Sequence, residues 1–92
     1  MYGRMTTFKA KDLAAVEAQL EEIGKKSSGF QGQVRSQVIW GDDGAGVVTA
    51  IYESEAAAKE AATHVAEIWG GLMPLLDGPP QTTEFSKAHI MK

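Results

Sequence analysis

The sequence contains no cysteine, which excludes a disulfide framework, thiolate catalysis and any metal site that depends on cysteine ligands. Asparagine is absent as well, which removes one of the polar residues that commonly orient ligands. No apolar run approaches the roughly 20 residues that span a bilayer, and the first residues lack the charged-then-apolar pattern of a signal peptide. We therefore expect a cytoplasmic protein with no membrane partner.

Clustered positive charge is also missing. Nine Lys and Arg residues are scattered along the chain against twelve Asp and Glu, which gives a net charge of −3 and a pI near 5.3. Because nucleic-acid phosphates require a clustered basic face, we expect no nucleic-acid partner. The Gly-rich stretch 41–46 lacks the Lys-Ser/Thr ending of a phosphate-binding loop. We expect no metal site and no cofactor.

What the chain does contain is a regular change of hydrophobic period. Residues 2–9, rich in Thr and aromatics, are typical of a strand. Asp12 can cap the helix that follows. The apolar stripe of that helix consists of residues spaced three and four apart, namely Leu13, Val16, Leu20 and Ile23. Residues 28–32 are typical of a tight turn, in which we expect Phe30 to fill the core.

A hairpin is predicted next. Residues 33–40 alternate, with Val34, Ser36, Val38 and Trp40 on one face and Arg35, Gln37 and Ile39 on the other. The turn residues 41–44 supply Asp and Gly, which tolerate a positive φ. Residues 47–52 then return as the partner strand.

The last part of the chain repeats the helix-to-strand step. Ser54 can cap a second helix, which we expect to end at Gly70-Gly71, and Pro74 can open one further short turn. Residues 81–89 are typical of a final, more polar strand. The order βαββαβ predicts a ferredoxin-like α+β fold, with two helices on one face of a four-stranded antiparallel sheet. We expect residues 1–92 to form a single domain.

The strand at residues 47–52 is apolar on both faces. Two helices can cover only one face of a four-stranded sheet, and a strand with one wet face would alternate between apolar and polar residues. We therefore expect the second face to pack on another copy of the chain, in a twofold homodimer. A chain of 92 residues buries only about 60–65% of its unfolded surface, so a partner would also add stability.

Two short motifs carry a resemblance to a known family. One is the turn Gly29-Phe30-Gln31-Gly32 after the first helix, and the other is Tyr52-Glu53-Ser54-Glu55-Ala56 at the entry to the second. Together with the order of elements over essentially the whole chain, they resemble the dimeric α+β barrel superfamily, especially its antibiotic-biosynthesis-monooxygenase-like branch. The resemblance implies two ferredoxin-like subunits that join their sheets into a barrel with the helices outside.

Members of that branch include cofactor-free oxygenases of aromatic polyketides and haem-degrading enzymes. For these activities the resemblance implies an asparagine, a tryptophan and a further tyrosine or histidine. Trp69 lies on a predicted helix, but the chain has no asparagine, and no histidine follows Trp69 before His89. We therefore expect that haem is neither bound tightly nor degraded.

Three aromatic residues are candidates for a ligand pocket. Trp40, Tyr52 and Trp69 could clamp a flat ligand, because aromatic side chains contribute both contact area and orientation. The alternative is that they pack in the core. Arg35 also has two interpretations, since it could hold an anionic group or reach solvent or a partner's carboxylate.

His64 is the candidate for catalysis and a further candidate for the pocket. Glu60 lies four residues before it and Glu67 three residues after it, so all three share one flank of the predicted helix. Such a set could bind a divalent metal or tune the imidazole as a base. The alternative is a partly solvated histidine paired with its helical neighbours.

Two functions of different class remain open. The first is a small-ligand protein of the monooxygenase-like barrel type, a cofactor-free oxygenase or related enzyme acting on an aromatic or quinol-like metabolite. In that case Trp40, Tyr52 and Trp69 shape the cavity and His64 handles a proton. The second is a non-enzymatic dimeric binding or stress-related module. A cavity that reaches His64 would favour the first, and a fully packed interior the second.

Overall fold

The computed structural model describes residues 1–27 and 31–91. The elements follow the predicted order: β1 (Tyr2–Lys9), α1 (Leu13–Ser27), β2 (Gln33–Trp40), β3 (Ala45–Tyr52), α2 (Glu55–Leu72), the 3₁₀ helix η1 (Met73–Leu75) and β4 (Gln81–Phe85). The prediction that Phe30 fills the core lies outside the described residues, as do residues 28 and 29 of the predicted turn.

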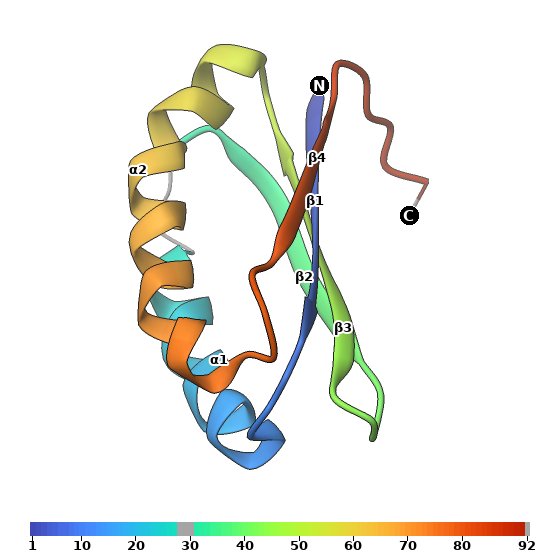
Figure 1. Ribbon diagram of the computed structural model, residues 1–92. Coiled ribbons are helices and arrows are strands. Elements are labelled where there is room, and N and C mark those ends of the chain that lie inside the picture. The colour runs from blue at the N-terminus through green and yellow to red at the C-terminus, as the bar shows by residue number, and fades with distance from the viewer. Residues whose placement is uncertain (28–30, 92) are drawn as a thin grey trace.

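The strands form one antiparallel sheet in the order β2-β3-β1-β4. Figure 1 shows α1 and α2 together on one face of this sheet, and the segment after β4 on the opposite side. One layer of helices on one face of an antiparallel sheet is the arrangement of an α+β domain. The predicted ferredoxin-like fold is confirmed. Within the described residues, no helix is long and apolar enough to cross a bilayer.

Both predicted helix caps are present. The Asp12 carboxylate accepts a hydrogen bond from the Ala15 amide at 3.2 Å, and the Ser54 hydroxyl accepts one from the Ala57 amide at 3.2 Å. A side-chain oxygen at this position satisfies an amide that has no partner within the helix. The two caps therefore set where α1 and α2 begin.

The second helix does not end at Gly70-Gly71 as predicted. α2 continues to Leu72, and the Met73 amide still donates to the Trp69 carbonyl. Glycine in a helix costs roughly 1 kcal/mol relative to alanine, and burial of the Leu72 side chain, which is only 5% exposed, offsets part of that cost. The short turn predicted at Pro74 is confirmed as η1.

β4 is also shorter than the predicted strand 81–89. Its pairing with β1 runs from Thr7 opposite Gln81 to Gly3 opposite Phe85. Since β1 begins at Tyr2, almost no partner remains for a longer strand. Residues 86–91 instead turn onto the helix-free face of the sheet (Figure 1).

The described residues form two clusters of buried side chains. The larger one is built on residues of β1, both helices and the segment after η1, with the α1 stripe packed against it: Phe8, Ala10, Val16, Leu72 and Leu76, with Leu13, Leu20 and Ile23. The predicted stripe of α1 is confirmed. The smaller cluster contains Tyr52, Ala58 and Ala61, where the small alanines let α2 approach the sheet closely.

β2 departs from a regular strand near its start. A bulge lies between Gln33 and Arg35, and Val34 there is 44% exposed. After the bulge, Ser36 pairs with Ala50 on β3. Because a bulge adds one residue to one strand, it resets which side chains face the helices.

Candidate functional site

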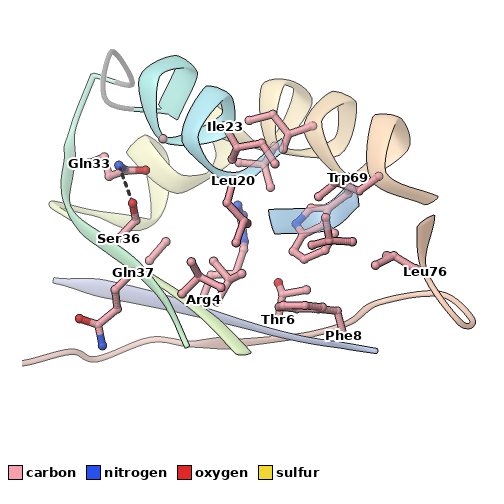
Figure 2. A pocket seen from close by; sticks show the side chains of 18 of the residues that line it. Arg4, Thr6, Phe8, Leu20, Ile23, Gln33, Ser36, Gln37, Trp69 and Leu76 are labelled. Carbon is pink, nitrogen blue, oxygen red and sulfur yellow. Dashed lines mark hydrogen bonds between the residues drawn. The ribbon is translucent and has the colours of Figure 1, made fainter. Parts of the chain in front are cut away.

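A cavity of about 210 Å³ lies between the sheet and the two helices. Its lining comes from β1, β2, β3, α1 and α2. Figure 2 shows labelled lining side chains on both sides of this space, with Gln33 and Ser36 toward one end and Trp69, Phe8 and Leu76 toward the other. The interior of the described structure is therefore not fully packed.

One end of the cavity is aromatic and apolar. The rings of Phe8 and Trp69 lie 5.8 Å apart between centroids and are tilted by 52°. Phe8 pairs with Gly46 across β1 and β3, and a Cβ added to Gly46 would lie 2.4 Å from the Phe8 ring. The absence of a side chain at Gly46 thus makes room for the ring that forms this wall.

The other end carries polar groups. The Gln33 side-chain amide donates to the Ser36 hydroxyl at 3.3 Å, and both residues line the cavity. Tyr52 lies opposite Gln33 in the sheet register and is almost completely buried. The cavity therefore has one end suited to an apolar ring and one suited to oxygen atoms.

Arg4 is the charged residue of this polar end. Its side chain is 10% exposed, and Nη2 donates to Glu84 Oε1 at 3.1 Å and to the Ala58 carbonyl at 3.3 Å. The guanidinium also stacks over the Tyr52 ring, 5.7 Å from its centroid. The register explains this position, because Arg4 pairs with Ala50 on one side and with Glu84 on the other.

The protonation of nearby groups follows from these contacts. Burial raises the pKa of the Tyr52 hydroxyl, and the Arg4 charge opposes that change. Tyr52 is therefore a hydrogen-bond donor at neutral pH. The hydrogen bond from Arg4 lowers the pKa of Glu84. None of the described residues lining the cavity is an Asp, Glu or His, so the lining can bind and orient an anion but contains no ordinary proton acceptor.

The structure places the sequence candidates in different environments. Tyr52 and Trp69 both line the cavity, whereas Trp40 and His64 are not among its lining residues. Trp40 is 41% exposed, and its indole N–H donates to Glu17 at 2.9 Å. His64 lies on an exposed part of α2. The structure thus brings Tyr52 and Trp69 to one cavity.

Arg35 faces a different part of the molecule. It borders a shallow hollow on the helix-free side of the sheet, together with Thr49, Ile51, His89 and Ile90. The described residues contain no group of three or more His, Asp or Glu side chains that could hold a metal ion.

Sequence reasoning missed Arg4. The available signal was its phase, because Arg4, Thr6 and Phe8 alternate along residues 2–9 and must share a face. A charge on the same face as a core phenylalanine indicates either a buried ion pair or a ligand site.

Comparison with solved structures identifies proteins of similar fold. A monooxygenase from the gene ActVA-Orf6 of Streptomyces coelicolor, in complex with nanaomycin D, has a TM-score of 0.74 at 24% identity, covering 99% of this chain and 90% of that chain. SnoaB, a cofactor-independent oxygenase from Streptomyces nogalater, was solved as a variant. It has a TM-score of 0.80 at 15% identity, covering 98% of this chain and 95% of that chain.

A candidate antibiotic biosynthesis monooxygenase from Deinococcus radiodurans has a TM-score of 0.80 at 16% identity, covering 100% of this chain and 97% of that chain. No protein-family model matches the sequence, and comparison with curated proteins gives no significant match. At these identities the likeness shows the fold, and it is the fold of the antibiotic-biosynthesis-monooxygenase-like proteins that the sequence resembles.

Proposed function

We propose that the protein binds a small, flat aromatic or quinol-like metabolite between its sheet and helices and oxidises it with O₂ without a cofactor. The observation that carries this proposal is the cavity, which joins an aromatic end at Phe8 and Trp69 to a polar end at Arg4 and Tyr52. Its volume of about 210 Å³ is below the roughly 300–1,000 Å³ of drug-sized sites. A ligand with a single aromatic ring or two fused rings fits a cavity of this volume.

The reaction needs no external reductant. A phenol that becomes a quinone gives four electrons to O₂: one oxygen atom enters the ring as a carbonyl, and the other leaves as water with two hydrogens from the substrate. The electron-rich, deprotonated ring is the form that reacts most readily. The positive charge of Arg4 and the Tyr52 hydroxyl, both at the polar end, support such an anion. We assign charge stabilisation to these two residues, and proton removal to water.

We also propose that the protein works as a homodimer joined through the helix-free face of the sheet. Ile39, Val47 and Ile51 share this face according to the strand register, and Phe85 is on the same side. Ile39 is 63% exposed and Phe85 47% exposed. Large apolar side chains exposed on one face of a sheet favour an interface there, and a twofold dimer buries them symmetrically.

The second candidate is a binding module without turnover. It is favoured by one observation, the lack of an Asp, Glu or His among the described residues of the cavity lining. Both candidates require the same cavity and the same kind of ligand. They differ only in whether the bound ligand reacts.

An oxygen electrode separates the two candidates. The purified protein is mixed with 1-naphthol under air, and oxygen uptake is compared with the formation of naphthoquinone by absorbance. The oxygenase is supported if one O₂ is consumed per quinone formed and if oxygen is taken up faster than in the same mixture without protein. Binding of 1-naphthol by calorimetry with no uptake supports the binding module, and the absence of binding contradicts both.

A further inference from the structure

Arg4 holds an unusual position, because it alone among the described residues that line the cavity carries a charge at neutral pH. Its side chain is 10% exposed. Its counter-charge, Glu84, comes from the edge strand β4 and is 47% exposed. A buried cation compensated from the solvent side is only partly neutralised, because water screens an exposed partner. The cavity therefore keeps a net positive character.

The guanidinium also has donors to spare. An arginine presents five N–H donors in a planar fork. Within the described part of the chain, Nη2 of Arg4 donates to Ala58 and Glu84, and the Tyr52 hydroxyl takes a further hydrogen bond from the guanidinium. These three bonds leave two of the five N–H groups for a ligand. Stacking over Tyr52 holds the plane of the group in place, so the remaining donors are presented by a side chain that is already ordered.

We propose that the ligand of this cavity is an aromatic carboxylate and that Arg4 is the residue that selects it. This inference rests on the proposed binding of a small aromatic ligand and adds the chemical class of its polar end. A carboxylate is ionised at neutral pH and offers two oxygens that match two N–H groups of an arginine fork. A phenol hydroxyl, with a pKa near 10, is uncharged at neutral pH, so in a hydroxylated aromatic acid the carboxylate is the group that Arg4 holds before the ring is deprotonated.

The Glu84 carboxylate then competes with the ligand carboxylate for Arg4. Its Oε1 occupies one Arg4 nitrogen at 3.1 Å, and its negative charge repels a second carboxylate nearby. Removing that charge while keeping the side-chain size should strengthen the binding of an anionic ligand. A purely structural role of the Arg4–Glu84 pair would not produce such a gain. Glu84→Gln is therefore the informative substitution, and its exposed position makes it tolerable for folding.

Calorimetric titration with 2-naphthoate and 2-naphthamide tests the inference. The two probes have nearly the same shape, but only 2-naphthoate is charged. In the parent protein we expect 2-naphthoate to bind at least tenfold more tightly than 2-naphthamide. Arg4→Met should reduce this preference to less than twofold, and Glu84→Gln should raise the affinity for 2-naphthoate severalfold with no change for 2-naphthamide.

The outcomes separate this inference from the proposed function. Equal affinities of the parent for both probes overturn the selection by Arg4 and leave the aromatic cavity intact. A preference that survives in Arg4→Met overturns it as well. If Arg4→Met does not fold, the Glu84→Gln variant still tests the inference. Affinity of this variant for 2-naphthoate that is equal to or weaker than that of the parent contradicts the inference. Failure of both probes to bind the parent overturns the inference and the proposed function together.

Discussion

Trp69 combines two roles in one side chain. It packs on Phe8 with ring centroids 5.8 Å apart, and it also lines the cavity. Atoms that face a cavity have fewer partners than atoms in a close-packed core, so they contribute less dispersion energy to the folded state. The stability that Trp69 provides should therefore fall below that of a fully packed aromatic residue.

We expect Trp69→Ala to lower the free energy of unfolding by about 2 kcal/mol, below the roughly 3–5 kcal/mol typical of a packed aromatic. The same variant should bind 2-naphthoate at least tenfold more weakly. Urea denaturation and calorimetry measure the two effects. Trp40→Ala is the control: Trp40 is 41% exposed, so it should cost less than about 1 kcal/mol and keep the affinity. Equal, small effects of both substitutions would contradict the placement of Trp69.

Glu84 should make a small contribution to stability that depends on pH. Its pKa is lowered in the folded protein by the Arg4 hydrogen bond, so its contribution is complete above the unfolded pKa and is lost as pH falls through the folded pKa. Because Glu84 is largely exposed, we expect Glu84→Gln to cost less than about 1 kcal/mol at pH 7. Urea denaturation at successively lower pH should show the two proteins converging. A gap that persists in acid would mean that the ion pair is not its cause.

The candidate site was only partly predictable, residue by residue. Tyr52 and Trp69 could be chosen as cavity residues because large aromatics on apolar faces are few. The alternation along residues 2–9 could have placed Arg4 on the core face, but it could not identify the partner of Arg4, because Glu84 is 80 positions away in the chain. Which strand pairs with β1, and in which register, is decided by tertiary contacts and not by a local period.

The elements were more predictable than the site. Apolar spacing and the caps at Asp12 and Ser54 defined both helices, since these signals act within one or two turns. The errors lie where tertiary contacts decide. α2 runs through Gly70-Gly71 because Leu72 is buried, and the final strand stops at Phe85 because β1 offers almost no further partner.

The close contact between β1 and β3 gives a prediction at this scale. We expect Gly46→Ala to destabilise the protein by about 1–3 kcal/mol, because its Cβ would lie 2.4 Å from the Phe8 ring and 2.9 Å from the Ile39 carbonyl oxygen. Gly24→Ala in α1 is the control, since its Cβ meets nothing within 4 Å, and it should gain up to about 1 kcal/mol. Thermal unfolding compares them. A neutral Gly46→Ala would mean that Phe8 does not depend on this space.

At the scale of the whole molecule, the sheet has one face covered by helices and one without helices (Figure 1). Residues 86–91 lie along part of the second face, beside Arg35 and Ile51. Ile39 remains 63% exposed. A small domain gains much of its stability from the surface it buries, so covering this face with a second copy would stabilise both chains.

We expect sedimentation at micromolar concentration to give a mass near twice 9.9 kDa. Ile39→Glu, on the helix-free face, should shift the protein toward the monomer, because a buried unpaired charge is costly. Ala66→Glu, on an exposed position of α2, is the control and should leave the dimer intact. A parent protein that sediments as a monomer, or equal behaviour of the two variants, would contradict assembly through the sheet.

The continuation of α2 through Gly70-Gly71 also affects how fast a ligand can enter and leave the cavity. These glycines lie between Trp69 and Leu72, which both form part of the cavity wall. Each lowers the local helix stability by roughly 1 kcal/mol relative to alanine, so this turn should open more often than the rest of α2. Each opening moves part of the wall aside. The opening rate of this one helical turn would then limit both how fast the ligand enters and how fast it leaves. Because entry and exit are limited by the same opening, a change in the opening rate would alter both rates and leave the affinity unchanged.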